Sequence, residues 1–499
     1  AERRKKYAAM LDKAALNNGA RDAYAMVKLR PERKVANSQD NEGVDDQSHA
    51  EAQIKKWTEI WAATPNGPLP PMKHNLMTAN VGDTSTAVLS NFQHTANTVK
   101  QATKKHKMNT ALGVDNLSPK PITYLSDECH AAFAEFLNHI QRQLEWPEAI
   151  RAILMACIPK EDGDWRLVGL LPTPFRIWAA SVVHIVSVWM DSLERQYVKF
   201  GVGKGSEQAA YRVALAAEAK EDDMETLLAI GDLQKGFEMI RYHRLYRAAV
   251  KYRYPLDILV ISLHMYTAQR RVKCGQAVSR GVWASYGIVA GCPIAMSLML
   301  LNLLEPFDQF VDAMPIQLDE LGLYVDDFIM LFVMRECDVS QRNKAIQAIR
   351  MLVGMLDEND SPVKKEKGRL MSTSNHLAKQ VAIETKDLGF EQVKEAKVLG
   401  VDTSAGNVVR HKAMTLRAKK AKLKSKKVNR MFAIRHKRMN MVRAYTSGAM
   451  RYSAMVNGIP PRVVRQVRPQ LHRSIAKNTG GSATVLLALQ RNRWIDPWY

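Results

Sequence analysis

The chain has 499 residues, of which 46% are hydrophobic and 24% charged, the balance of an ordinary globular protein. This composition excludes a wholly disordered, collagen-like or disulfide-dense protein, and the length has room for about two to four domains. The formal net charge of +22 is unevenly distributed, since residues 403–495 contain 22 Lys and Arg and no Asp or Glu. The rest of the chain has 50 basic and 50 acidic side chains. Such a polycation is expected to bind a polyanion, with a solubilising or localising tail as the alternative.

The five cysteines stand far apart and form neither a CxxC pair nor a Cys/His cluster with zinc-motif spacing (Cys129, Cys157, Cys274, Cys292 and Cys337). We therefore expect reduced core thiols and a reducing intracellular compartment, either nuclear or cytoplasmic. The uncharged run 281–304 reaches membrane-spanning length but contains Gly287, Gly291 and Pro293. We interpret it as a loop followed by a core helix, so no membrane partner is expected.

In chain order, residues 1–30 are predicted to be helical, and the polar stretch 31–52 indicates a linker. A short helix is expected around Trp57 and Trp61. Hydrophobic patterning begins near Lys104 and continues to about Val401, with helix-like and strand-like stretches alternating, so we predict an α+β fold. The expected helices are 131–144, 209–220, 240–252 and 344–356, and the expected strands are 227–232, 321–333 and 397–401.

The segment 410–443 has 14 Lys and Arg among its 34 residues. Small and apolar residues recur there at spacings of three and four, which predicts one stripe of a helix. The stripe, which is expected to pack on the body of the protein, consists of Met414, Ala418, Ala421, Ser425, Val428 and Phe432. The lysines that such a helix would present outward to nucleic acid are Lys419, Lys420, Lys422, Lys424, Lys426 and Lys427. A solvated basic face is the alternative.

The stretch 321–333 (LGLYVDDFIMLFV) places Asp326 and Asp327 between two apolar runs. A hairpin with both acids at its tip would hold a double negative charge on a buried element, which is costly unless a cation compensates. A divalent metal meets that need, and oxygen ligands favour Mg²⁺ or Mn²⁺. Asp232, which ends the apolar strand 227–232, is the third candidate ligand, with a helix N-cap as its alternative role.

Between these acids, Gly287 and Gly291 precede a long apolar run in SYGIVAGCPIAMSL. Glycines at these positions would allow the backbone to approach a flat ligand closely. A simple loop at the entry of a helix is the alternative.

The order of these three segments resembles that of reverse transcriptases. Asp232–Glu238 (DLQKGFE) is similar to motif A of that family, 287–293 (GIVAGCP) to motif B, and 324–327 (YVDD) to the YxDD motif C. Other segments follow in the family's order over about residues 110–402. These are 112–116 (LGVDN), similar to the GxDG-type opening of the fingers in non-LTR retrotransposon enzymes, 158–160 and 165–170, similar to the PK…RPI-L segment there, 365–367 at the place of motif D, and 398–401, similar to the motif E hairpin.

The resemblance implies a right-hand polymerase fold of fingers, palm and thumb. Residues 1–105 would be an N-terminal extension and linker, and residues 106–215 the fingers. Residues 216–402 would be the palm, with an antiparallel sheet and motifs A to E. Residues 403–499 would be a basic helical thumb that holds the template–primer backbone without reading its sequence.

The resemblance also implies an RNA-directed DNA polymerase that extends a DNA or RNA primer with dNTPs on an RNA template. The implied catalytic metal ligands, which would hold Mg²⁺ or Mn²⁺, are Asp232, Asp326 and Asp327. The implied nucleotide contacts are Lys160 and Arg166 at the triphosphate, Gly291 under the nascent base pair and Phe237 against the sugar. The implied proton donor to the leaving pyrophosphate is Lys367 or Lys365.

Two alternatives remain beside this interpretation. RNA-dependent RNA polymerases share the metal chemistry, but they usually carry an Asp at the position of Phe237, where an aromatic ring would exclude a 2′-hydroxyl. A catalytically weak RNA-binding protein of the same ancestry, such as a splicing cofactor, would not need the three intact carboxylates. Motif B departs from the family's Pro-Gln-Gly-Ser at 289–292 (VAGC), which bears on fidelity more than on activity.

Overall fold

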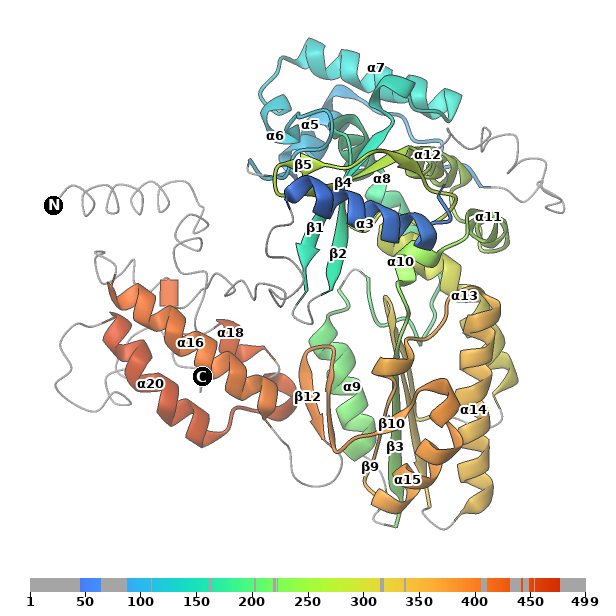
Figure 1. The fold of residues 1–499 in the computed structure, drawn as a ribbon, viewed down its shortest axis with the longest axis vertical. Coiled ribbons are helices and arrows are strands. Elements are labelled where there is room, and N and C mark those ends of the chain that lie inside the picture. The colour runs from blue at the N-terminus through green and yellow to red at the C-terminus, as the bar shows by residue number, and fades with distance from the viewer. Residues whose placement is uncertain are drawn as a thin grey trace.

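The computed structural model describes residues 45–63 and 88–475, except 109, 161–163, 202, 219–220, 222, 315–317, 336–337, 405–410, 431–440, 443–447 and 453. The helix expected at 1–30 and Cys337 lie outside the described residues. The chain forms two lobes, each with its own sheet, and a helical arm that projects to one side of the second lobe (Figure 1). Among the described residues, none of the helices is both long and apolar enough to cross a membrane.

The first lobe is built on a sheet in the order β2-β1-β4-β5, with β6 also paired to β4. Its strands are β1 (Ala152–Pro159), β2 (Trp165–Leu170), β4 (Gln269–Cys274), β5 (Ala277–Val278) and β6 (Val282–Trp283). Its helices are α3 (Asp46–Ile60), α5 (Ala96–Lys104), α6 (Pro119–Ile122), α7 (Asp127–Gln143), α8 (Thr173–Ser192) and α12 (Leu256–Tyr266), with the 3-10 turn η2 (Glu148–Ile150). Because β4 pairs in parallel with β1, the lobe takes in residues well beyond the predicted boundary at 215.

The polar linker predicted at 31–52 is wrong for its last residues, because α3 begins at Asp46. Asp45 caps this helix by accepting a hydrogen bond from the backbone amide of Ser48 at 2.6 Å. Ala50, Ile54 and Trp57 recur at helical spacing and are buried in the main core. This part of the presumed extension is therefore an integral part of the first lobe.

The second lobe contains a sheet in the order β10-β9-β3-β8-β7, in which all pairs except β9 with β10 are antiparallel. Its strands are β3 (Glu225–Asp232), β7 (Glu320–Tyr324), β8 (Asp327–Met334), β9 (Arg369–Ser372) and β10 (Glu391–Gln392). The helices and 3-10 turns around it are α9 (Ser206–Glu218), α10 (Gly236–Met239), α11 (Tyr242–Lys251), α13 (Ala295–Ala313), α14 (Val339–Glu358), η3 (Lys365–Lys367), α15 (Asn375–Glu384) and η4 (Lys386–Leu388). The helices and strands expected at 131–144, 209–220, 240–252, 344–356, 227–232 and 321–333 are confirmed, the last as the β7–β8 hairpin.

The central strands β3 and β8 are apolar between their ends because both of their faces are covered. Along β8, Phe328 and Met330 face the main core, whereas Ile329 and Leu331 belong to a smaller cluster on the other face that also includes Val213 of α9. The contact of α9 with β7 and β8 places this helix in the second lobe, before the predicted start of the palm at 216. The core helix expected in 281–304 is confirmed as α13, and the loop before it is irregular except for the short strand β6.

A separate hairpin, β11 (Glu395–Val398) with β12 (Val401–Ser404), leads into the arm. The expected single strand at 397–401 is therefore two strands, joined by Leu399 and Gly400, both at positive φ. Asp402 of β12 caps the first arm helix, since its carboxylate accepts hydrogen bonds from the amides of Ala413 at 2.7 Å and Met414 at 3.0 Å.

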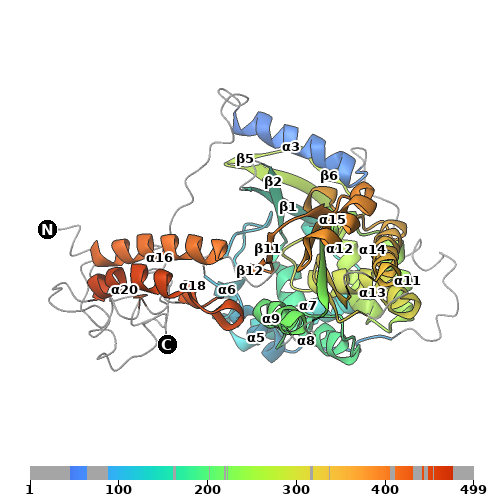
Figure 2. The same ribbon diagram turned by 90° about the horizontal axis from the view of Figure 1, so that it is seen from below.

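The arm consists of α16 (Lys412–Arg430), α18 (Gly448–Arg451), α19 (Ala454–Asn457) and α20 (Pro461–Ile475), and Figure 2 shows α16 and α20 lying side by side. The predicted stripe of α16 is buried from Met414 to Val428, whereas Phe432 lies outside the described residues. The prediction that this stripe packs on the body of the protein is wrong. Among the described residues, the stripe packs on Val463, Val467 and Leu471 of α20. Two amphipathic helices thus cover each other's apolar faces.

Candidate active site

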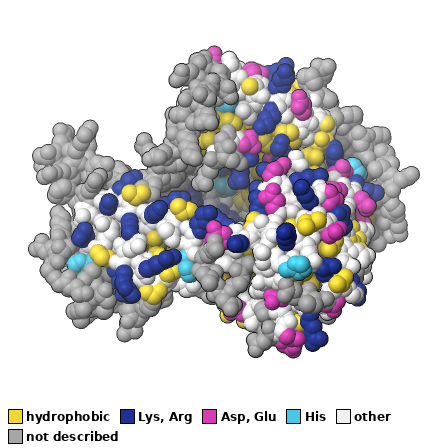
Figure 3. Space-filling view, turned by 60° about the horizontal axis from the view of Figure 1, so that its bottom comes forward, with side chains coloured by type: hydrophobic (Ala, Val, Ile, Leu, Met, Phe, Trp, Pro, Cys, Tyr) yellow, Lys and Arg dark blue, Asp and Glu magenta, His cyan; other side chains and the backbone are white. Residues whose placement is uncertain are grey.

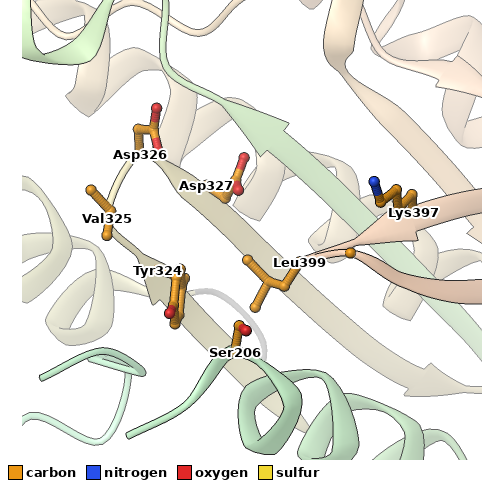
Figure 4. Close-up of a pocket in the computed structure, with 8 residues that line it drawn as sticks. Ser206, Tyr324, Val325, Asp326, Asp327, Lys397 and Leu399 are labelled. Carbon is orange, nitrogen blue, oxygen red and sulfur yellow. The ribbon is translucent and has the colours of Figure 1, made fainter. Parts of the chain in front are cut away.

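The β7–β8 hairpin carries the two adjacent acids at its tip, as the sequence predicts. Tyr324 pairs with Asp327, so Val325 and Asp326 form a two-residue turn, with Val325 at a φ of +62°. The carbonyl of Asp326 accepts a hydrogen bond from the amide of Leu233 at 3.0 Å, which ties the turn to the end of β3. In Figure 4 the side chains of Asp326 and Asp327 point the same way from this hairpin.

Asp232 comes from the neighbouring strand and lies directly opposite Asp327 in the antiparallel pairing of β3 with β8. The preceding pair is Gly231 with Phe328, and a Cβ on Gly231 would fall 2.2 Å from the ring of Phe328. Only glycine leaves room for that ring, which holds the ends of the two strands in register. Asp232 is the last residue of its strand and does not cap α10, whose N-cap is Lys235. The alternative role of Asp232 as an N-cap is therefore wrong.

The three carboxylates repel one another in a partly buried place. Burial and the charge of Asp232 raise the pKa of Asp326, against the opposite effects of Lys367 and Arg166. Burial, then Asp326 and Asp232, raise the pKa of Asp327 to about 7. Three carboxylates supply hard oxygen donors and a net negative charge, which fit a divalent cation such as Mg²⁺.

Lys367 contacts this cluster directly, with its Nζ 2.7 Å from Oδ2 of Asp232. The backbone holds it there, because the amide of Lys364 donates to the carbonyl of Asp232 at 2.8 Å. Gly389, at a φ of +85°, packs so closely on Lys365 that a Cβ would lie 2.4 Å from the Cα of that residue. Both lysines predicted as the proton donor are exposed, and Lys367 is the one that contacts Asp232.

The glycine-rich loop before α13 lies against β2. The amide of Gly169 donates to the carbonyl of Ala290 at 3.0 Å, and a Cβ on Gly169 would collide with the side chain of Val289. Gly291 has a φ of +101°, and a Cβ on this residue would lie 3.3 Å from the carbonyl oxygen of Gly169. The loop is therefore fixed to the strand that carries Arg166.

The two predicted triphosphate contacts differ in their surroundings. Arg166 on β2 is exposed and lies near enough to Asp326 for its charge to lower the pKa of that acid. Lys160 forms an ion pair with Asp164 at 3.0 Å, and Lys56 of α3 binds the same carboxylate at 2.9 Å. Burial acts to raise the pKa of Asp164, but the two lysines hold it below its usual range. Lys160 is thus part of a three-residue charge cluster at the β1–β2 turn.

Phe237 lies on the short helix α10, just after the acid-bearing end of β3. The preceding residue, Gly236, lies close to Asp326. A Cβ on Gly236 would be 3.6 Å from the Cβ of Asp326. The Phe237 side chain is partly buried, and its carbonyl accepts a hydrogen bond from the amide of Ile288 at 2.9 Å. The segment of Phe237 therefore joins the acids to the glycine-rich loop.

A pocket of about 550 Å³ adjoins Asp326 and Asp327, between the hairpin tip, α9 and the β11–β12 turn (Figure 4). Its lining is Ser206, Tyr324, Val325, Asp326, Asp327, Lys397, Leu399 and Gly400. Tyr452 of the arm links two of the lining residues. Its hydroxyl donates a hydrogen bond to the carbonyl of Leu399 at 2.6 Å and lies 2.7 Å from Oγ of Ser206. Ser206 and Tyr452 lie in no recognisable sequence pattern, and neither is among the predicted site residues.

The predicted nucleic-acid lysines lie on α16, away from the acids. Lys419, Lys420 and Lys426 are exposed, and the others of the set are partly buried (Lys422, Lys424 and Lys427). Lys422 donates to Oε1 of Gln466 on α20 at 3.2 Å. Figure 3 shows Lys and Arg side chains along the arm and around the hollow between the arm and the lobes.

The comparison with known families agrees with this geometry. Residues 158–403 match the model of the family described as reverse transcriptase (RNA-dependent DNA polymerase). A search of curated proteins finds no match. The matched segment runs from the end of β1 to β12 and includes all three converging carboxylates. Residues 158–403 are therefore a reverse transcriptase domain.

Proposed function

We propose that this protein is an RNA-directed DNA polymerase that extends a DNA or RNA primer with dNTPs on an RNA template. The observation that carries this proposal is the convergence of Asp232, Asp326 and Asp327 at one end of the second-lobe sheet, inside a reverse transcriptase domain. We assign the second lobe to the palm, the first lobe to the fingers and the arm to the thumb.

We assign the three carboxylates to the binding of Mg²⁺, with Mn²⁺ as the alternative ion. When bound, such ions align the primer 3′-hydroxyl with the α-phosphate of the nucleotide and neutralise charge on the leaving pyrophosphate. Lys367, held at Asp232, would hold a proton beside the acids and pass it to a pyrophosphate oxygen. Its ion pair with Asp232 supports this role.

The remaining contacts of the nucleotide are assigned by position. Arg166, whose charge reaches Asp326, suits the triphosphate because a guanidinium binds phosphate oxygens with two parallel donors. Lys160 belongs to the same hairpin. Phe237 is assigned to the sugar, where its ring would exclude a 2′-hydroxyl, and Gly291 to the face of the nascent base pair. The exposed lysines of α16 would hold the phosphate backbone.

We further propose that the enzyme is of the non-LTR retrotransposon type. The support is the segment 112–116, which packs on the start of α8 in the first lobe. The carboxylate of Asp115 accepts a hydrogen bond from the amide of Thr173 at 2.5 Å. A Cβ on Gly113 would lie 2.7 Å from the carbonyl of Leu171, so this position favours glycine.

The deciding experiment is primer extension by the purified chain on poly(rA)–oligo(dT), with dTTP or UTP and with Mg²⁺ or Mn²⁺. Extension with dTTP that requires a divalent ion is the expected result. Extension with UTP at equal efficiency would instead identify an RNA polymerase. Tight, salt-sensitive binding of the template–primer without extension under either ion would identify an RNA-binding protein of the same ancestry.

A further inference from the structure

Three side chains of types that can ligate a metal come together in the first lobe. They are one histidine and two cysteines, and none of them belongs to the carboxylate site described above. The ligand atoms of His49 on α3, Cys157 on β1 and Cys274 on β4 all lie within 4.8 Å of one another. The three residues have no zinc-motif spacing along the chain, so the sequence did not indicate this cluster. The parallel pairing of β1 with β4 aligns Ala156 with Lys273, so the next residues, Cys157 and Cys274, are neighbours across the strands.

The prediction that the cysteines are buried in the core is wrong for Cys129 and Cys157. Cys129 is exposed and Cys157 is only partly buried, whereas Cys274 and Cys292 are buried. A Cys pair beside a solvent-reachable edge and an imidazole is chemically different from scattered core thiols, because it can coordinate an ion.

We propose that His49, Cys157 and Cys274 bind one zinc ion, with water as the fourth ligand. Two sulfurs and one imidazole nitrogen are the donors that zinc prefers, and they discriminate against Mg²⁺, which prefers oxygen. A tetrahedral zinc ion with bonds of about 2.0–2.3 Å holds its ligand atoms about 3.5–3.8 Å apart. The observed separations therefore need only small side-chain rotations to close on the ion.

The surroundings of His49 suit a metal ligand. Its Nε2 lies 3.3 Å from Nε2 of Gln53, one turn further along α3. Oε1 of Gln53 is buried and has no hydrogen-bond partner among the described residues. With the amide turned over, Oε1 would accept a hydrogen bond from the Nε2–H of His49 and leave Nδ1 to bind the ion. The ring also packs edge-on against Trp165, at 4.6 Å between centroids.

Zinc binding would change the protonation of both cysteines. Burial raises the pKa of Cys157 and of Cys274, so the metal-free chain holds thiols. Their charged neighbours are Asp164 and Lys56 for Cys157, and Asp46 for Cys274. Each thiol would release its proton to solvent as its sulfur binds the ion, so binding of one zinc ion liberates two protons and weakens as the pH falls.

The ion would fasten α3 to the first-lobe sheet. The same helix holds Asp164 through Lys56, and the residue after it, Trp61, lies under the buried guanidinium of Arg270, at 4.6 Å from ring centroid to Cζ. The ion would thus hold α3 in place and take no part in the Mg²⁺ chemistry proposed above.

The test measures zinc in the full chain purified under reducing conditions. The variants are H49Q, C157S and C274S, with C129S as the control because Cys129 is exposed on α7, outside the cluster. We expect about one zinc ion per chain in the wild type and in C129S, and loss of stoichiometric zinc in the other three. The variant Q53A should retain the site with about tenfold weaker affinity. Excess Mg²⁺ should displace none of the zinc.

Two measurements on the wild type alone keep the proposal testable if a variant misfolds. Zinc should slow the alkylation of Cys157 and Cys274, followed by peptide mass spectrometry, and leave that of Cys129 unchanged. Co²⁺ in place of zinc should give thiolate charge-transfer bands and the strong visible bands of a tetrahedral site. Absence of bound zinc at micromolar free zinc would overturn the proposal. So would a Cys157–Cys274 disulfide that persists in the chain purified with reductant.

Discussion

Asp232 and Asp327 face each other across the antiparallel pairing of β3 with β8, each at the end of its strand nearest the hairpin turn. Asp326 in that turn is joined to the residue after Asp232 by a backbone hydrogen bond of 3.0 Å. Two strands buried on both faces thus bring three carboxylates to one edge. The free energy that holds the carboxylates together comes from the apolar strands behind them and not from the carboxylates themselves.

The first prediction concerns the metal ligands. Asp232→Asn and Asp326→Asn keep the shape of each side chain but remove one negative charge. Each should reduce polymerisation below about a tenth of the wild-type rate, because loss of a metal ligand costs several kcal/mol of barrier. Template–primer binding should be unchanged, and Asp312→Asn, at an exposed position of α13, serves as the control. A rate above that limit in either variant would refute the metal assignment.

The second prediction concerns the choice of sugar. Phe237→Val should raise the incorporation of rNTPs relative to dNTPs, because the smaller side chain leaves space at the 2′ position without touching the carboxylates. The ratio of kcat/KM for rNTP and dNTP measures the effect. Phe136→Val, at a partly buried aromatic residue of α7, is the matched control. An unchanged ratio in the Phe237 variant would mean that this ring only fills space.

The third prediction separates the two lysines of η3. Lys367→Ala should slow single-nucleotide addition by about a hundredfold, since general acids typically contribute factors of this order. Lys365→Ala should have little effect, because Lys367 is the residue whose Nζ contacts Asp232. Pre-steady-state addition at saturating template–primer is the measurement. Equal rates in the two variants would remove Lys367 from the reaction.

The fourth prediction tests the arm. Replacement of Lys419, Lys422 and Lys426 by Gln should flatten the slope of log affinity against log salt by about 2–3 units. Processivity should fall, while single-nucleotide addition at saturating template–primer should hardly change. The matched control replaces the exposed lysines Lys344, Lys379 and Lys386 of the second lobe. An unchanged slope would identify the basic face as merely solvated.

The packing of the arm can be checked separately from its charge. Ala421 is fully buried between α16 and α20. Ala421→Asp would bury an unpaired carboxylate at a cost of several kcal/mol and should unfold the arm. Limited proteolysis would then cleave the arm in the variant and spare it in the wild type. Phe432, the last residue of the predicted stripe, lies outside the described residues.

The fifth prediction follows from Glu238 on α10. Burial raises the pKa of Glu238 from 4.5 to about 7, with Arg270 among the charges that oppose the shift. Between pH 4.5 and 7 the folded chain therefore keeps a proton that the unfolded chain has lost, so stability falls as the pH rises through this window. Glu238→Gln stays neutral and should gain about 1–3 kcal/mol over the wild type across it.

Urea denaturation at several pH values measures this difference. Glu384→Gln, at an exposed position of α15, is the control and should follow the wild-type curve. Parallel curves for the wild type and Glu238→Gln would show that Glu238 is charged throughout and that its pKa is not raised.

Sequence alone determined the features that depend on local pattern. The apolar runs before Asp232 and around Asp326 predicted strands that end in acids, because a strand buried on both faces is apolar throughout. The three- and four-residue spacing from Met414 to Val428 predicted one buried stripe of α16. The helix expected around Trp57 and Trp61 is part of α3, but the polar residues before it concealed its start at Asp46. The ordered motifs then led to the family.

Only the tertiary structure decided which distant residues meet. The register of β3 with β8 places Asp232 against Asp327, and the fold around η3 selects Lys367 over Lys365. The pairing of β1 with β4 places Cys157 beside Cys274, and the packing of α3 on β4 adds His49, which no spacing along the chain indicated. Strand order and register follow from the packing of whole elements, and a shift of one residue would turn every side chain of a strand to the other face. Local sequence patterns predict each helix or strand, but they do not indicate which other helix or strand it packs against.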